Sequence, residues 1–144
     1  MTLEQKIKGR RIGVIGMARS GLAAAQMIKK LEGTVFVSDS AGESSLVEAT
    51  GTLRKYGIPF ETNGHTDKLL KNDFLIVSPG VPGNIPIIKE ALEKGIPLFS
   101  EIELASWVCQ GAICAITGSN GKTTTTTLIG EILNAGGVKA VMCG

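Results

Sequence analysis

The fold of this chain is decided by residues 11–31, which read RIGVIGMARSGLAAAQMIKKL. Residues 11–16 combine isoleucine and valine with a final glycine, as expected of a buried strand that turns sharply. Apolar residues then recur at helical spacing, at Leu22, Ala25, Ile28 and Leu31. A strand followed at once by a helix with one apolar face is the unit that builds a parallel sheet with crossover helices. The stretch therefore predicts an α/β fold.

The same alternation continues to about residue 110. Further strands are expected at 34–38, 59–62, 73–77 and 97–100, and helices around 46–53, 85–92 and 101–108. The run from Asp73 to Val77 is apolar after its first residue, which is typical of a strand buried on both faces of a parallel sheet. Residues 1–110 are therefore predicted to form a Rossmann-like domain, a parallel five-stranded sheet with flanking helices.

After Gly111 the pattern starts again. A strand is expected at 112–116, a helix at 122–134 and another strand at 138–142. One βαβ unit cannot cover both faces of its own sheet. Residues 111–144 are therefore predicted to be the truncated start of a second domain.

A phosphate-loop pattern joins the strand and helix of this second region, Thr117-Gly-Ser-Asn-Gly-Lys-Thr-Thr124. Its glycines allow backbone N–H groups to turn toward phosphate oxygens, and the helix N-terminus adds unpaired donors. We expect Lys122 to reach the β- and γ-phosphates and the Thr123 hydroxyl to ligate Mg²⁺. The pattern predicts a nucleotide site; the alternative is a glycine-rich structural turn.

A second glycine turn, Gly16-x-Ala18-x-x-Gly21, follows the first predicted strand. It matches a dinucleotide-binding fingerprint except at Ala18, whose methyl group would crowd a pyrophosphate. Asp39 follows at the distance where an acid bonds a ribose hydroxyl. A nucleotide diphosphate site and a purely structural turn both remain open. Near it in the predicted sheet, the loop Ser78-Pro-Gly-Val-Pro-Gly83 ends a central strand, where open α/β sheets place ligands.

Charge and hydropathy exclude several classes of protein. The 15 Lys+Arg and 13 Asp+Glu are scattered and give a net charge of +2, so no nucleic-acid partner is expected. The longest uncharged stretch, residues 104–121, contains polar side chains that a bilayer core would not accept, so no membrane association is expected. Residues 1–10 lack the apolar core of a secretory signal. We expect a cytoplasmic protein.

The cysteines and the single histidine suggest no site. Cys109, Cys114 and Cys143 are odd in number and form no CxxC pair, so they are predicted to be small buried hydrophobic residues. His65 lies in the turn signal Asn63-Gly64-His65-Thr66 and is predicted to be a solvated loop residue without a role.

Four motifs together resemble the bacterial Mur ligases, and within that family the branch that adds D-glutamate. They are Gly16-x-x-x-Ser20-Gly21, Val77-Ser-Pro-Gly-Val81, Ser100-Glu-Ile-Glu-Leu104 and Ile116-Thr-Gly-Ser-Asn-Gly-Lys-Thr-Thr124. The resemblance extends over the whole chain. It implies a longer enzyme that uses ATP and Mg²⁺ to join D-glutamate to UDP-MurNAc-L-alanine through an acyl phosphate, in peptidoglycan precursor synthesis. We expect a monomer that is inactive as this fragment, because the family's D-glutamate site and its second set of Mg²⁺ ligands lie beyond Gly144.

The resemblance also implies residue roles. Residues 1–110 would bind the UDP part of the substrate, with Arg19 and Ser20 at the diphosphate and uracil, Asp39 and Ser40 at the uracil, and Gly80 beside the uridine. The ATP loop would comprise Gly118, Ser119, Asn120, Gly121, Lys122, Thr123 and Thr124. Within it, Lys122 would be catalytic, stabilising the transferred charge, and Thr123 would be the metal ligand.

Two other interpretations compete with this one. A stand-alone Rossmann-like module that senses NAD(H) or a nucleotide is favoured by Asp39 and disfavoured by Ala18 and the second phosphate loop. Alternatively, residues 111–144 are only a structural extension whose phosphate loop is unformed because its neighbours are missing.

Overall fold

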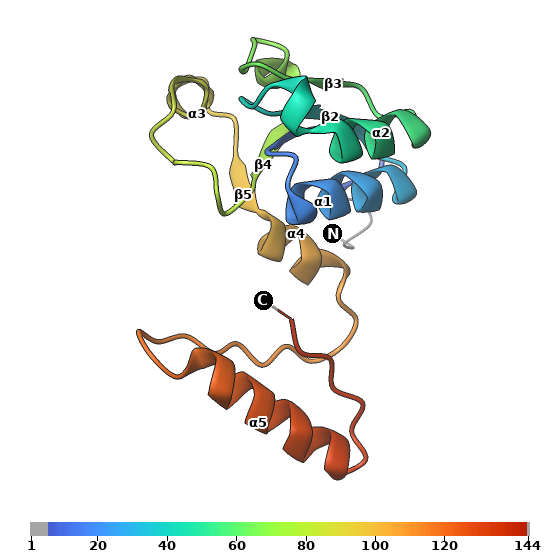
Figure 1. The fold of residues 1–144 in the computed structure, drawn as a ribbon, viewed down its shortest axis with the longest axis vertical. Coiled ribbons are helices and arrows are strands. Elements are labelled where there is room, and N and C mark those ends of the chain that lie inside the picture. The colour runs from blue at the N-terminus through green and yellow to red at the C-terminus, as the bar shows by residue number, and fades with distance from the viewer. Residues whose placement is uncertain (1–5, 144) are drawn as a thin grey trace. The chain divides into compact units, whose positions relative to one another are not determined.

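The computed structural model describes residues 6–143. The chain divides into two compact units, Met1–Cys109 and Gln110–Gly144 (Figure 1). Within each unit, the positions of the strands and helices decide where ligand-binding groups gather.

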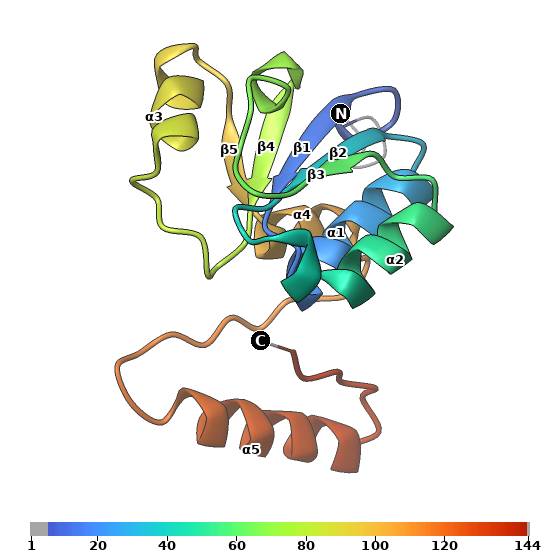
Figure 2. The same ribbon diagram turned by 45° about the horizontal axis from the view of Figure 1, so that its top comes forward.

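The first unit contains the predicted five-stranded parallel sheet (Figure 2). Its strands are β1 (Arg11–Ile15), β2 (Thr34–Ser38), β3 (Phe60–Glu61), β4 (Phe74–Val77) and β5 (Leu98–Ser100). They lie in the order β3-β2-β1-β4-β5, so the chain reverses its direction of growth beside β1. In such a sheet the crevice at the carboxyl ends of β1 and its neighbours is the usual ligand site.

Helices cover both faces of this sheet. They are α1 (Arg19–Lys30), α2 (Val47–Lys55), α3 (Pro86–Glu93) and α4 (Glu101–Val108), with single 3₁₀ turns η2 (Glu43–Ser45) and η3 (Leu69–Lys71). The predicted α/β fold class is confirmed for the first unit. The helix expected from Leu22 begins earlier, at Arg19, and the strand expected at 59–62 is only two residues long.

Two apolar clusters separate these layers. One cluster packs α1, α2 and α4 on one face of the sheet, with Ile28, Leu53 and Leu104 fully buried. The other packs α3 and η3 on the opposite face, around Ile15 and Leu75. Alternation of side chains along β1 divides its residues between the two clusters, as a strand buried on both faces requires.

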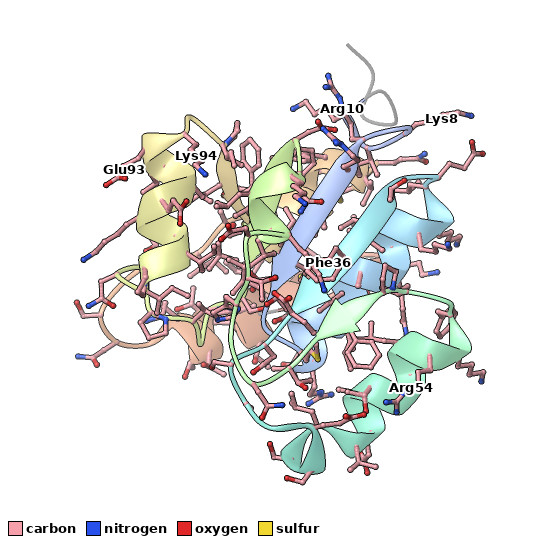
Figure 3. The ribbon with its side chains drawn as sticks, turned by 90° about the horizontal axis from the view of Figure 1, so that it is seen from above. Lys8, Arg10, Phe36, Arg54, Glu93 and Lys94 are labelled. Atoms are coloured by element: carbon pink, nitrogen blue, oxygen red, sulfur yellow. The ribbon has the colours of Figure 1, made fainter. Side chains whose placement is uncertain are left out.

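Charged side chains lie at the rim of the first unit. Figure 3 shows Phe36 on β2, within the sheet, and Arg54 on α2, near the β3 edge. The Arg54 guanidinium lies 5.3 Å from the centre of the Phe60 ring. The Lys68 ammonium lies 5.8 Å from the Phe36 ring. Both cations thus lie over aromatic faces at the β2 and β3 side of the sheet.

The second unit contains one helix, α5 (Lys122–Ala135), as its only regular element among the described residues, as expected from 122–134. The strands expected at 112–116 and 138–142 are not formed. A strand needs a neighbouring strand to pair with, and neither segment pairs with one in the described part of this unit; Asn134 instead bonds the backbone of Ala140. The expectation of a complete βαβ unit is therefore wrong for this chain.

The second unit also leaves its apolar side chains in solvent. Ile132 is 61% exposed and Val141 is 80% exposed. Cys114 and Cys143 are exposed, as is Cys109 at the end of the first unit, so the prediction that the cysteines are buried is wrong. Burial of these residues would require a layer that the described residues of the second unit do not supply.

Candidate functional site

The turn between β1 and α1 can be made only with glycine at two positions. Gly16 has a φ of 104°, and its N–H donates to the Ser38 carbonyl at 2.8 Å. A Cβ atom on Gly21 would lie 2.1 Å from the Gly16 carbonyl oxygen. The two glycines thus bring the first turn of α1 directly against the end of β1.

The N-terminus of α1 is open to an anion. Ala18 precedes the helix and provides no side-chain cap, and the first turn contains no acidic residue. The first N–H groups of a helix lack intrahelical partners and carry the positive end of its dipole. Arg19, which is exposed, and Ser20, which is half-buried, are the first two residues of α1. The predicted diphosphate residues therefore lie where a phosphate would be stabilised.

Ser78 is a polar residue of this site that the sequence interpretation did not single out. It follows β4, is 4% exposed, and its hydroxyl has no hydrogen-bond partner. A Cβ atom on Gly21 would lie 3.0 Å from Ser78 Oγ, so the hydroxyl lies against the β1–α1 turn. A buried hydroxyl without a partner costs free energy unless a ligand or water bonds it. In the sequence, the signal that could have identified Ser78 is its position directly after the apolar run that ends at Val77.

Gly80 lies in the exposed loop that follows Ser78. No atom lies within 4 Å of the position that a Cβ atom would occupy there. Packing of the loop does not require glycine at this position, and the open space beside it is available to a ligand.

Asp39 connects two of the predicted ligand loops. Its Oδ2 accepts a hydrogen bond from the Met17 N–H at 2.7 Å, and its Oδ1 accepts one from the Ala41 N–H at 2.8 Å. The carboxylate therefore fixes the β1–α1 turn relative to the turn after β2, where Ser40 is exposed. A carboxylate oxygen has lone pairs for a second donor, so these bonds leave Asp39 able to bind a ligand.

A hollow of about 440 Å³ lies beside this turn. It is lined by residues 17–19, by Leu22 and by residues 44–49. Its walls combine apolar side chains with the start of α1, a combination typical of small-molecule sites. Arg19 lines it, whereas Ser20, Asp39, Ser40 and Gly80 do not.

His65 is not the solvated residue that the sequence predicts. It is half-buried, and its Nδ1 lies 2.8 Å from Ser38 Oγ. Burial lowers the pKa of His65, and the nearby Asp39 and Glu61 carboxylates offset only part of that effect. The sequence indicated the loop correctly, but it did not show that the loop folds back onto β2.

In the second unit the phosphate loop has the backbone that its glycines predict. Gly118 has a φ of 153° and Gly121 a φ of 75°, and no side chain caps α5. The Lys122 ammonium donates to the Gly118 carbonyl at 2.5 Å, so it bonds the loop itself. An adjoining hollow of about 360 Å³ is lined by Ile116, Lys122, Thr123, Thr126, Thr127, Met142 and Cys143. Ser119, Asn120 and Thr124 are exposed and do not line it.

Comparison with known proteins assigns the family. The family model for the MurD N-terminal domain matches residues 11–85. The UDP-N-acetylmuramoylalanine--D-glutamate ligase of Chlorobium limicola is 49% identical over 133 residues, which are 92% of this chain and 28% of that protein. The protein of the same name from Streptococcus agalactiae is 44% identical over 139 residues, with 95% and 31% covered. The chain thus spans about 30% of the length of these relatives.

Solved structures agree with this assignment. The UDP-N-acetylmuramate-alanine ligase of Thermotoga maritima superposes with a TM-score of 0.58 at 27% identity, covering 87% of this chain and 29% of that one. A murein peptide ligase from Psychrobacter arcticus gives a TM-score of 0.61 at 24% identity, covering 90% and 27%, and supports the fold alone. The family model matches more than half of the chain, and the fold agrees with it, so the chain belongs to the MurD N-terminal domain family.

Proposed function

We propose that this chain is the N-terminal part of a UDP-N-acetylmuramoylalanine--D-glutamate ligase that works in peptidoglycan precursor synthesis. The observation that carries the proposal is the 49% identity over 133 residues to a protein of that name. A match of that length is longer than the first unit, so it includes residues of both units. The first unit would bind the UDP-linked substrate and the second would begin the ATP-binding domain.

The first unit would hold UDP-MurNAc-L-alanine at the carboxyl edge of its sheet. The diphosphate would accept hydrogen bonds from the open N-terminus of α1, at Arg19 and Ser20. The unpartnered Ser78 hydroxyl is a further donor beside that turn. Asp39 and Ser40 would bond the uracil, and Gly80 would leave space for the uridine.

The second unit would contribute the loop that holds ATP and its Mg²⁺. The residues present fit this role, because Gly118 and Gly121 adopt positive φ, α5 is uncapped, and Lys122 and Thr123 line one hollow. Thr123 would ligate the metal through its hydroxyl, as part of the segment 118–124. When bound, ATP with Mg²⁺ supplies the phosphoryl group that activates a carboxylate toward an amine.

Lys122 has a specific task in this proposal. Its ammonium would leave the Gly118 carbonyl and bond phosphate oxygens, where it would stabilise negative charge during transfer. Lysine suits this role because its long stem lets a compact charge move between two acceptors.

The substrates that meet this site would be UDP-MurNAc-L-alanine and D-glutamate. We further propose a monomer in the cytoplasm, without nucleic-acid or membrane partners. Among the described residues, no helix combines the length and the apolar character needed to cross a bilayer.

Calorimetric titration of the 144-residue chain with UDP-MurNAc-L-alanine, UDP, NADH and Mg²⁺-ATP tests the proposal. We expect the UDP compounds to bind and NADH not to bind. Tight binding of NADH without binding of UDP compounds would instead identify a nucleotide-sensing module.

A second assay addresses catalysis. The chain mixed with both substrates and Mg²⁺-ATP is expected to release no phosphate, because the described second unit forms no sheet behind its phosphate loop. Phosphate release that depends on D-glutamate would contradict this expectation.

A further inference from the structure

His65, the single histidine of the chain, is hydrogen-bonded to the last residue of β2, which directly precedes the proposed uracil-binding residues Asp39 and Ser40. Ser38 is the last residue of β2, is fully buried, and directly precedes Asp39. Its hydroxyl oxygen lies 2.8 Å from His65 Nδ1 and 2.7 Å from Glu61 Oε1. Three polar side chains from β2, β3 and the loop after β3 therefore meet at one buried oxygen.

The positions of the hydrogens follow from the chemistry of these groups. Burial raises the pKa of Glu61, but hydrogen bonds from Thr66 and Ser38 and the Lys68 charge outweigh it, so the pKa is below its ordinary value. At neutral pH Glu61 is therefore a carboxylate, which only accepts hydrogen bonds. The one hydroxyl proton of Ser38 has two acceptors, Glu61 Oε1 at 2.7 Å and the Gly64 carbonyl at 3.4 Å, and it is donated to the closer carboxylate. Ser38 Oγ then accepts from His65. His65 is thus held as the tautomer that carries its proton on Nδ1.

The backbone of the same loop is bonded to the turn after β2. The Asp39 N–H donates to the Glu61 carbonyl at 3.1 Å, and the Gly64 N–H donates to the Asp39 carbonyl at 3.2 Å. The Asn63 N–H donates to the Ala41 carbonyl at 2.9 Å. Residues 61–66 therefore form an outer support for residues 39–41.

We propose that His65 is a positioning residue for the uridine part of the ligand. Its Nδ1–H bond to Ser38 holds residues 61–66 against Asp39 and Ser40, so that these two residues are already placed when the ligand arrives. The inference rests on the proposed function, because it assumes that a uridine binds at Asp39 and Ser40.

The charged groups around His65 influence the pH at which its ring is protonated, and therefore the pH at which it can support uridine binding. Asp39 and Glu61 favour the imidazolium, whereas burial disfavours it more strongly. The neutral ring therefore prevails above its ordinary pKa of about 6.5. Below that value, His65 binds a proton more readily when residues 61–66 have moved away from β2 than when they are packed against it. Acidification therefore favours the released loop, and the affinity for uridine should fall.

Nitrogen-15 NMR of the chain tests the hydrogen-bond assignment directly, since the only imidazole signals come from His65. We expect the Nδ1–H tautomer at pH 7.5, and loss of that preference in Ser38→Ala. An Nε2–H tautomer in the unsubstituted chain would overturn the proposal.

Titration with UDP-MurNAc-L-alanine tests the positioning role. Asparagine can donate from a similar position and does not titrate, whereas leucine cannot donate. We expect His65→Asn to bind within about twofold of the unsubstituted chain, without the loss of affinity below pH 6.5, and His65→Leu to bind about tenfold more weakly. The thermal midpoints of both variants control for folding.

The outcomes separate the two proposals. If the unsubstituted chain fails to bind any UDP compound, the proposed function fails and the positioning role fails with it. If the unsubstituted chain and the folded His65→Leu variant bind equally well, only the positioning role is overturned.

Discussion

The two units share the same local pattern at their ligand turns, but only the first unit forms a sheet. Each places a glycine turn before an uncapped helix, α1 in the first and α5 in the second. In the first unit β1 pairs with strands on both sides, and α1 buries Ala24, Ala25 and Ile28. In the second unit the flanking segments form no strands, and Gly130 is the one buried residue of α5. A βα sequence pattern is therefore enough to form the helix, whereas the strand forms only when neighbouring strands are present to pair with it.

The largest expected effect comes from breaking the turn of the first unit. In Gly21→Ala the new Cβ would lie 2.1 Å from the Gly16 carbonyl, a backbone atom that cannot move freely. We expect a loss of about 3 kcal/mol or more in the free energy of unfolding, because overpacking here displaces α1 from β1. Urea unfolding followed by Trp107 fluorescence measures it, since Trp107 packs against Phe74 and Phe99.

Gly51→Ala is the matched control. Gly51 is an exposed residue inside α2, and a Cβ atom there would meet no atom within 4 Å. The same chemical change should stabilise the protein by about 0.5–1 kcal/mol, because alanine has the higher helix propensity. Equal effects of the two substitutions would contradict the packing described for the β1–α1 turn.

A second pair of substitutions compares the interiors of the units. Leu53→Ala removes a fully buried side chain from the first unit and is expected to cost about 2–5 kcal/mol. Ile132→Ala removes a side chain that is 61% exposed in the second unit and should change stability by less than about 0.5 kcal/mol. Chemical denaturation of both variants gives the comparison. A large loss in Ile132→Ala would show that the second unit has a packed core of its own.

The smallest expected effect is a dependence of stability on pH through Glu61. Its folded pKa lies below the ordinary value of 4.5, so its contribution is fully present above pH 4.5. That contribution is lost as the pH falls through the folded pKa, because the unfolded chain then binds the proton more readily. Denaturation midpoints between pH 3 and pH 7 should fall less steeply on acidification in Glu61→Gln. Identical pH profiles would show that Glu61 is not held as a bonded carboxylate.

The sequence predicted most of the framework but less of the site. Periodicity located all five strands of the first unit and α5, since local apolar patterns are strong where helices and strands are packed. The strands expected at 112–116 and 138–142 were mispredicted, because periodicity does not reveal whether a partner layer exists. The cysteines were mispredicted because their number and spacing carry no information about the layer that would bury them.

The missed contacts of the site have a different cause. Ser38 and His65 are separated by 27 positions, and their meeting depends on how the loop after β3 folds back. The unpartnered Ser78 hydroxyl likewise depends on its approach to Gly16 and Gly21. Such contacts between distant segments leave no periodic signal, whereas the phosphate loop, which is contiguous, does.

The central proposal is that the first unit binds a UDP-linked substrate at the carboxyl edge of its sheet, whereas the phosphate loop of the second unit does not take part in that binding. Backbone NMR of the 144-residue chain during titration with UDP-MurNAc-L-alanine tests it most directly. We expect saturable shifts at residues 16–21, 38–41 and 78–80, with no change at 118–124. Shifts confined to 118–124, or none at the β1–α1 turn at saturating ligand, would contradict it.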